Sequence, residues 1–276
     1  MKELISKLAE TKVEPGDYRG DDGLLYCGKC HTPKQTRLSG PAGDLLPELV
    51  PISCECQKRE YEENERRIRL EQFRADMARR LDDGISSPDG LRHDFGQDDR
   101  KEARVSDACR KYVECWPEMR ENNIGILFYG SVGTGKSFYA SCIGNGLLDR
   151  MVPVASTNFP RLMNLLQGTY EKQELLDRLS IYKLLILDDL GVERDSTYAA
   201  EQIFNIIDAR SNSELPVIVT TNMTLEELEH PTSMQYARIY DRVLEMCPIR
   251  LKLVGESRRR SNASEREQLA RKILLG

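Results

Sequence analysis

The chain has 276 residues, which is enough for one large domain or for two smaller ones. Its net charge of -5 argues against a protein that binds nucleic acid mainly through charge, although it allows a local basic face. No apolar run approaches the roughly 20 residues of a membrane span, and charged residues interrupt residues 1–10, so we expect neither a membrane anchor nor a signal peptide. Of the eight cysteines, four are clustered and four are scattered, which favours a reduced, cytoplasmic protein.

The N-terminal region combines a short helix with two cysteine pairs. Residues 1–12 predict an amphipathic helix. The pairs that follow it are Cys27 with Cys30 and Cys54 with Cys56. Thiolates spaced in this way converge on one tetrahedral ion, so the pattern predicts a zinc site with four cysteine ligands, in which His31 is an alternative to one cysteine. Four free cysteines in a flexible segment are the other interpretation.

A long charged helix is predicted over residues 57–83, directly after the second cysteine pair. Its apolar residues recur at spacings of three and four and form one narrow stripe, made of Leu70, Phe73, Met77 and Leu81. The stripe indicates either a helix that docks on its own domain or an arm that binds a partner, and the sequence does not choose between them.

Turn-forming residues after this helix mark a domain boundary. We predict an N-terminal zinc-binding and helical domain over residues 1–85, a linker over 86–98, a larger domain over 99–260 and a charged helical tail over 261–276. The larger domain alternates helices (99–121, 138–150, 159–179 with a break near Gly168, 198–213, 234–246) with strands (124–129, 152–156, 184–189, 216–222, 249–254). This alternation predicts an α/β fold in which helices flank a parallel sheet.

A P-loop lies between the strand over 124–129 and the helix over 138–150. The pattern G-x-x-x-x-G-K-[ST] is matched at every fixed position, and its glycines allow a tight turn whose amides surround phosphate oxygens. Lys136 is predicted to reach the β- and γ-phosphates, and Ser137 to bind Mg²⁺. The residues assigned to nucleotide contact are Gly130, Ser131, Val132, Gly133, Thr134, Gly135, Lys136, Ser137 and Phe138.

Two later strands end in polar residues. The strand over 184–189 is an unbroken apolar run that ends in Asp188 and Asp189, which is a Walker B pattern. Because ligands bind at the carboxyl ends of parallel strands, Asp188 is predicted to hold Mg²⁺ and Asp189 to orient or deprotonate the attacking water. The strand over 216–222 ends in Asn222, which either contacts the γ-phosphate or the water, or caps the next helix.

Together these residues resemble the DnaC/IstB-like group of AAA+ ATPases, and within it the DnaC-like replicative helicase loaders. The resemblance covers roughly residues 93–260 and depends on Gly130–Ser137, Leu187–Gly191, Thr220–Asn222, Arg238–Arg242 and Gly255–Arg259.

The resemblance implies an AAA+ P-loop NTPase in which Asn222 is sensor 1. It also implies that Arg238 is the arginine finger for a neighbouring subunit, and that Arg259 is sensor 2. Arg242 and Arg258 are the alternatives for these two roles. Many AAA+ enzymes have glutamate where this chain has Asp189, whose side chain is one methylene shorter, so hydrolysis is expected to be slow.

The implied function is that of an ATP-dependent loader. It would bind ATP or ADP with Mg²⁺, associate with itself through the AAA+ domain, and help to place a hexameric replicative helicase on single-stranded DNA. The cysteine cluster is similar to the zinc-bearing, helicase-binding domain of related loaders. DNA contacts are sought among Phe159, Arg161, Tyr170, Lys172 and Arg178. The alternatives are an IstB-type transposition helper that acts on duplex DNA and a transposase, and an ATP-binding adaptor without hydrolysis.

Overall fold

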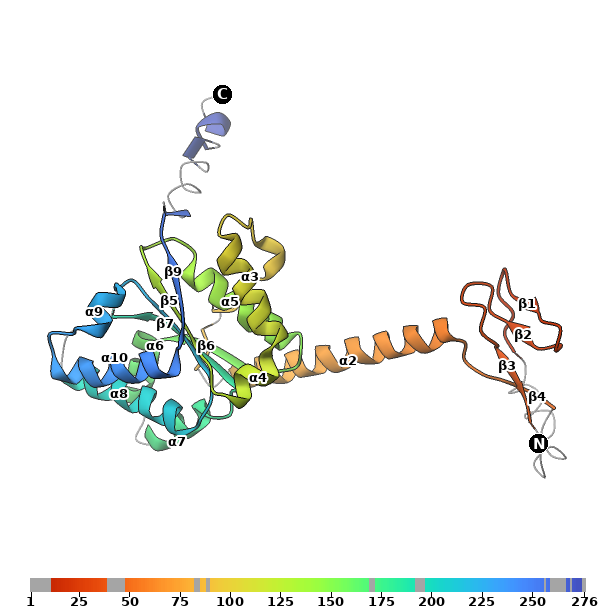
Figure 1. Ribbon diagram of the computed structural model, residues 1–276, viewed down its shortest axis with the longest axis horizontal. Coiled ribbons are helices and arrows are strands. Elements are labelled where there is room, and N and C mark those ends of the chain that lie inside the picture. The colour runs from red at the N-terminus through yellow and green to blue at the C-terminus, as the bar shows by residue number, and fades with distance from the viewer. Residues whose placement is uncertain are drawn as a thin grey trace. The chain divides into compact units, whose positions relative to one another are not determined.

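The computed structural model describes residues 11–38, 48–81, 85–87, 90–168, 172–191, 197–255, 257–258, 267–268 and 270–274. The chain divides into two compact units, Met1–Gln72 and Phe73–Gly276 (Figure 1). This division falls within a helix, whereas the sequence places the domain boundary in the turn residues that follow it, and the predicted domain limits stay a prediction. The helix expected over residues 1–12 lies almost entirely outside the described residues.

The first unit contains two small antiparallel sheets. Their strands are β1 (Tyr18–Arg19) with β2 (Leu25–Tyr26), and β3 (Gln35–Arg37) with β4 (Leu49–Pro51). Its interior holds an ion pair in which Lys34 Nζ lies 2.6 Å from Asp17 Oδ2, and both side chains are only 2% exposed. The hydrogen bond from Lys34 lowers the pKa of Asp17 to about 2, so the pair is charged at neutral pH. Such a small core contains little apolar surface to stabilise it.

Helix α2 (Glu55–Leu81) contains the apolar stripe that the sequence left unassigned. Met77 is 5% exposed and belongs to the main core of the second unit, against which Phe73 also packs. The end of the stripe therefore packs within the second unit, whereas the sequence assigns the whole helix to the N-terminal domain. In the part of α2 before Phe73, Tyr61 is 64% exposed, and the interpretation of that part as a partner-binding arm stays a prediction.

The second unit is built around a parallel five-stranded sheet with the strand order β6-β7-β8-β5-β9 (Figure 1). The strands are β5 (Ile126–Gly130), β6 (Val154–Asn158), β7 (Leu184–Leu190), β8 (Val217–Thr221) and β9 (Ile249–Leu253). The predicted α/β class is confirmed. Because all strands run the same way, the ends of β5, β7 and β8 meet at one edge of the sheet.

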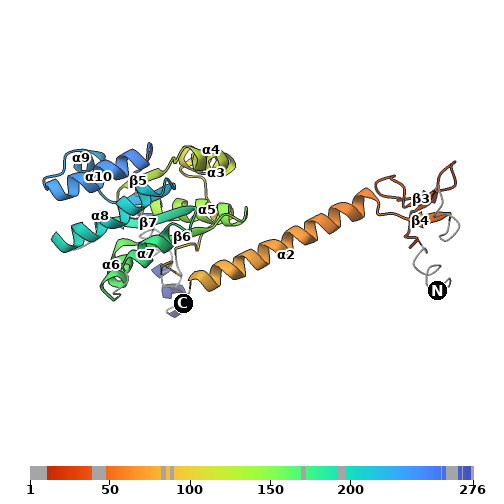
Figure 2. The same cartoon turned by 90° about the horizontal axis from the view of Figure 1, so that it is seen from below.

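Helices cover both faces of the sheet, as Figure 2 shows for α8 and α10 on one face and for α3 and α5 on the other. The helices are α3 (Ala103–Glu114), α4 (Trp116–Glu121), α5 (Lys136–Leu148), α6 (Phe159–Gly168), α7 (Lys172–Leu179), α8 (Thr197–Asn212), α9 (Leu225–Glu229) and α10 (Met234–Met246), with a short 3-10 helix η2 (Phe95–Gln97). Among the described residues, no helix is both long and apolar enough to span a membrane.

Alternate residues of each strand point to opposite faces, so the sheet separates two cores. The strand residues that pack with α6, α7, α8 and α10 include Leu127, Leu185, Leu187, Val217 and Val219. Those that pack with α3, α4 and α5 include Ile126, Phe128, Leu184, Ile186 and Ile218. Burial on both faces explains why these strands have continuous apolar sequences.

Two helices expected from the sequence are each divided into two. The helix expected over 99–121 breaks at Cys115, because Pro117 has no N–H group and is accommodated only in the first turn of a new helix, α4. The helix expected over 159–179 corresponds to α6 and α7, and α6 ends at Gly168, where the break was predicted.

The edge strand β6 is covered by residues that the sequence assigns to the domain boundary and linker. Ile85 is fully buried, and the backbone N–H of Ser87 donates to the carbonyl of Ser156 at 2.7 Å. The Ser86 hydroxyl accepts a hydrogen bond from the Ser156 N–H at 3.3 Å. The segment therefore satisfies edge groups that would otherwise be available to another strand.

Candidate nucleotide-binding and metal sites

The P-loop turns between β5 and α5 through three glycines in the left-handed region. Gly130, Gly133 and Gly135 have φ angles of 123°, 81° and 105°, which residues with a side chain rarely adopt. A Cβ atom on Gly133 would also lie 2.1 Å from Ser257 Oγ. Backbone conformation and close packing thus both require glycine in this loop.

Polar groups of the loop converge with the end of β7. Lys136 is 5% exposed, and its Nζ donates hydrogen bonds to the carbonyls of Gly130 at 2.9 Å and Ser131 at 2.7 Å. Ser137 Oγ donates to Asp188 Oδ1 at 2.8 Å. Adjacent ligands of an octahedral Mg²⁺ with bonds of about 2.1 Å lie about 3 Å apart, so the two oxygens fit this ion. The structure thus places together the two residues predicted to hold Mg²⁺.

The end of β7 is irregular where its two carboxylates lie. The register against β8 shifts between Leu187 and Leu190, so that Asp188 and Asp189 both lie opposite Thr220. Asp189 has a φ of 60°, a left-handed conformation that is uncommon for a residue with a side chain. This bulge ends the regular pairing at the carboxyl edge of the sheet, beside the P-loop.

Asn222 follows β8 directly and is exposed. The following helix, α9, is capped by Thr224, whose Oγ1 accepts a hydrogen bond from the N–H of Glu227 at 3.2 Å. The interpretation of Asn222 as the cap is therefore wrong, and the alternative, a role at the edge of the nucleotide site, stays a prediction.

The two arginines considered for the finger differ in their surroundings. On α10, Arg242 lies 2.7 Å from Asp208 Oδ1, and its guanidinium is 5.5 Å from the centre of the Phe204 ring. Arg238 is exposed and makes no ion pair within the part of the chain that the structure describes. Of the two, Arg238 is the one available to a neighbouring molecule.

Residues after β9 contact the P-loop. The N–H of Arg258 donates to the carbonyl of Gly133 at 2.9 Å, and its guanidinium lies 3.2 Å from Asp99 Oδ1. The N–H of Lys101 and the positive charge of Arg258 hold the pKa of Asp99 below its usual value. No spacing in the sequence connects Asp99 with the P-loop, and the predicted sensor 2 residue Arg259 lies outside the described residues.

A further contact of the P-loop helix involves Phe138, which the sequence assigns to the nucleotide site. Its ring lies 5.1 Å from that of His93, measured between ring centres. The Asn145 side chain on the same helix donates to the carbonyl of His93 at 2.8 Å. The segment before η2 therefore lies along α5, a contact that the linker prediction did not include.

The four predicted zinc ligands come together in the first unit. The sulfur atoms of Cys27, Cys30, Cys54 and Cys56 all lie within 4.8 Å of one another, and all four cysteines are free of disulfides. Thiolates at about 2.3 Å from a tetrahedral zinc ion lie about 3.8 Å apart, so this donor set fits zinc. His31 instead contacts Tyr18, with 3.3 Å between Nδ1 and the phenol oxygen. The geometry supports the set of four cysteines over one that includes His31.

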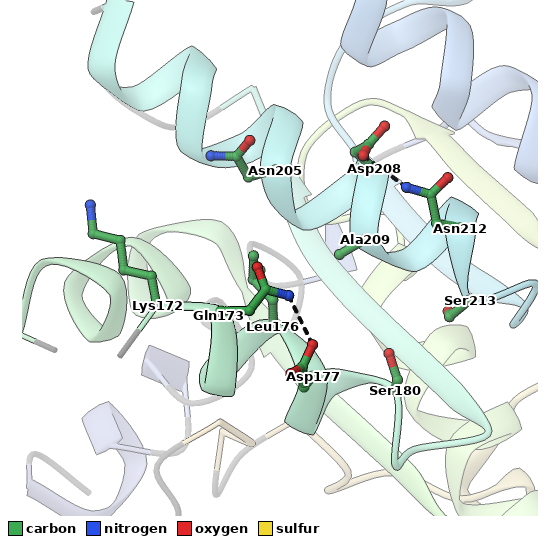
Figure 3. Close-up of a pocket in the computed structure, with 10 residues that line it drawn as sticks. All are labelled: Lys172, Gln173, Leu176, Asp177, Ser180, Asn205, Asp208, Ala209, Asn212 and Ser213. Atoms are coloured by element: carbon green, nitrogen blue, oxygen red, sulfur yellow. Dashed lines mark hydrogen bonds between the residues drawn. The ribbon is translucent and has the colours of Figure 1, made fainter. Parts of the chain in front are cut away.

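The residues considered for DNA contact differ in their surroundings. Phe159 is fully buried in the core, so its place among the candidates for DNA contact is wrong. Tyr170 lies outside the described residues. Lys172 lines a polar pocket of about 610 Å³ between α7 and α8, where Gln173 donates to Asp177 at 2.9 Å (Figure 3). None of the residues that line this pocket belongs to the P-loop or to the end of β7.

The part of the chain that contains the nucleotide site matches a known family of ATP binding proteins. The family model of the IstB-like ATP binding proteins matches residues 94–266, which is more than half of the chain. The chain belongs to this family. The matched range includes the P-loop, Asp188 and Asp189, Asn222 and both candidate finger arginines, and the predicted family and AAA+ fold class are confirmed. The N-terminal cysteine cluster lies outside it.

Replicative helicase loaders are among the similar proteins. DnaC of Escherichia coli (strain K12) is 34% identical over 139 residues, which are 49% of this chain and 54% of DnaC. DnaI of Bacillus subtilis (strain 168) is 28% identical over 149 residues, 49% of this chain and 47% of DnaI. A crystal structure of DnaI has a TM-score of 0.52 at 23% identity, over 62% of this chain and 95% of that one, and shows a shared fold. The chain spans about half the length of the curated relatives that it matches.

Proposed function

We propose that this IstB-like protein is a nucleotide-controlled helicase loader, in which ATP and Mg²⁺ bind between the P-loop and the end of β7. The observation that carries the proposal is the 2.8 Å hydrogen bond between Ser137 and Asp188, which joins the two predicted Mg²⁺ ligands across the site. The amides of the glycine turn and Lys136 would hold the phosphates. When bound, Mg²⁺ supplies charge neutralisation at the β- and γ-phosphate oxygens.

Hydrolysis is assigned to residues around this pair. Asp189 would orient or deprotonate the attacking water, and Asn222 would contact the γ-phosphate or that water. Arg238 would act on the nucleotide of a second copy of the chain, and its exposure and lack of an ion pair among the described residues support it over Arg242. Sensor 2 is assigned to Arg259 or to its alternative Arg258, and the bond from the backbone N–H of Arg258 to the carbonyl of Gly133 supports a position beside the P-loop for this segment. Turnover is expected to be slow, and its absence would indicate a non-hydrolysing adaptor.

The proposal also includes the macromolecular partners of the protein and a zinc ion at the cysteine cluster. The similarity to the replicative helicase loaders DnaC and DnaI supports a replicative helicase as the partner. Single-stranded DNA as the nucleic acid and a cytoplasmic location belong to the same proposal and come from the resemblance of the sequence. The cysteine cluster would hold zinc and thereby stabilise the first unit, which has a small core of its own. That unit is the proposed helicase-binding part.

The first experiment tests nucleotide binding. We expect the full chain to bind a fluorescent ATP analogue in the presence of Mg²⁺, and Lys136→Ala to lose this binding because the loop then has no ammonium for the phosphates. Lys111→Ala, which removes a lysine whose side chain is 70% exposed, is the matched control and should bind normally. Failure of the wild-type chain to bind would overturn the proposal.

The second experiment separates the loader from an IstB-type transposition helper, which the family match keeps as a second candidate. The full chain is incubated with the hexameric helicase of a candidate host, with and without ATP, and complex formation is measured. In parallel, ATP-dependent binding to single-stranded and duplex DNA is compared. A complex with the helicase and a preference for single strands support the loader, whereas no complex and a strong duplex preference support the helper.

A further inference from the structure

We infer that Thr220 is a positioning residue for both carboxylates at the end of β7, an inference that rests on the proposed binding of Mg²⁺ and ATP at this site. Thr220 lies on β8 and is fully buried. Its hydroxyl donates to Asp188 Oδ1 at 2.5 Å and accepts a hydrogen bond from the backbone N–H of Asp189 at 3.0 Å. One side chain therefore contacts the two residues to which metal binding and water activation are assigned.

The bulge in β7 explains why a side chain is needed here. Leu187 pairs with Val219, and Leu190 pairs with Thr221, so three steps along β7 match two along β8. The extra residue leaves a backbone N–H without a partner in the regular strand pairing. The hydroxyl of Thr220 accepts this N–H, and it thereby holds Asp189 in its left-handed conformation.

The other bond of the same hydroxyl determines the direction of Asp188. A threonine hydroxyl has one hydrogen to donate, and here that hydrogen points to Asp188 Oδ1. Ser137 donates to the same oxygen at 2.8 Å. The Ser137 oxygen is a predicted Mg²⁺ ligand, so the Thr220 bond is the one that orients Asp188 independently of the P-loop. Donation to one carboxylate oxygen fixes the rotation of the group and the position of its other oxygen.

The neighbouring residue offers a matched control. Thr221 is also fully buried on β8, and its hydroxyl donates to the carbonyl of Leu190 at 2.7 Å and accepts from the N–H of Met223 at 3.1 Å. It has the same residue type, strand and number of bonds as Thr220, but it contacts only backbone groups. A general effect of losing a buried hydroxyl from β8 will appear in both variants.

The test compares Thr220→Val, Thr220→Ser and Thr221→Val with the wild-type chain. Four quantities are measured: ADP affinity in EDTA, the Mg²⁺ concentration that half-saturates ATP binding, kcat for ATP with the partner and DNA present, and the unfolding temperature. For Thr220→Val we expect about a tenfold rise in the Mg²⁺ requirement and about a tenfold or larger fall in kcat, since a charge-assisted hydrogen bond is lost. ADP affinity in EDTA should change less than about twofold, because the P-loop is intact.

The serine variant and the control decide whether the effect is specific. Thr220→Ser retains the hydroxyl and should recover the Mg²⁺ requirement to within about threefold of the wild type. Thr221→Val should lower the unfolding temperature without changing the Mg²⁺ requirement. A wild-type chain that binds Mg²⁺ and ATP, together with a Thr220→Val variant of unchanged Mg²⁺ requirement and kcat, would overturn this inference alone. Absence of nucleotide binding by the wild type would overturn the proposed function and this inference with it.

Discussion

Replacement of Arg210 by methionine tests the structural basis of the nucleotide site most directly. Arg210 lies on α8, is 1% exposed, and makes no ion pair with a carboxylate within the described part of the chain. Its five hydrogen bonds, at 2.6 to 3.2 Å, reach four backbone carbonyls, those of Leu179, Tyr182, Lys183 and Pro216. These carbonyls precede β7 and β8, the strands whose other ends carry Asp188 and Asn222.

The expected loss of stability follows from these bonds. The carbonyl of Pro216 keeps the N–H of Leu185 at 3.5 Å, whereas those of Leu179, Tyr182 and Lys183 lose the Arg210 donor. Leaving a buried acceptor unsatisfied costs about 1 to 3 kcal/mol, so three carbonyls cost at least about 3 kcal/mol. Burial of the guanidinium lowers the pKa of Arg210 to about 9, which shows that the folded state disfavours its charge, and removal of that charge offsets part of the loss. We therefore expect Arg210→Met to reduce the free energy of unfolding by about 3 kcal/mol.

Urea unfolding followed by tryptophan fluorescence measures the free energy of unfolding of the second unit, which contains Arg210. Trp116, the single tryptophan, is 8% exposed and packs in one of the two cores of the second unit. A loss of about 3 kcal/mol corresponds to a midpoint lower by about 1 M urea at a slope of about 3 kcal/mol/M. The control is Arg120→Met, which removes an exposed hydrogen bond to the carbonyl of Glu214 and should change stability by less than about 0.5 kcal/mol. Equal midpoints for Arg210→Met and the control would refute the reasoning.

Three further predictions concern the other parts of the chain. Met77→Ala should lower the free energy of unfolding, measured by the same fluorescence, by about 2 kcal/mol or more, because a buried side chain leaves a cavity, while exposed Tyr61 can be replaced by alanine without effect. Native protein should contain one zinc per chain by elemental analysis, and Cys54→Ser should lose it; no stoichiometric zinc in reduced wild type contradicts the four-cysteine site. Arg238→Ala by itself should reduce ATPase activity about a hundredfold or more, and mixing it with Lys136→Ala copies, which keep Arg238, should restore part of that activity; Arg242→Ala should act mainly on stability, and the reverse ranking contradicts the finger assignment.

Sequence alone predicted the features that depend on neighbouring residues. The P-loop is contiguous, and its glycines, Lys136 and Ser137 obtain their geometry from one turn between a strand and a helix. The cysteine pairs and the apolar run before Asp188 are also contiguous in the sequence, so their spacing can be recognised without the fold. The α/β class followed from alternating periodicities, which each element shows by itself. The break at Gly168 was predicted, whereas the one at Cys115 within the helix expected over 99–121 was not, because a few residues decide where a helix ends.

Tertiary structure decided which of these elements are neighbours. Strand order places β8 between β5 and β7, and only this order brings Thr220 opposite the bulge that contains Asp189. From the sequence alone, Arg210 would be expected on the surface, as arginine usually is. The fold buries it because backbone carbonyls that precede β7 and β8 surround its guanidinium. The sequence left two interpretations of the stripe on α2, docking within the chain or binding a partner. The burial of Met77 in the core of the second unit decided for the first at this end of the helix. Pairings between residues distant in the chain depend on how whole faces pack, and no local spacing encodes that.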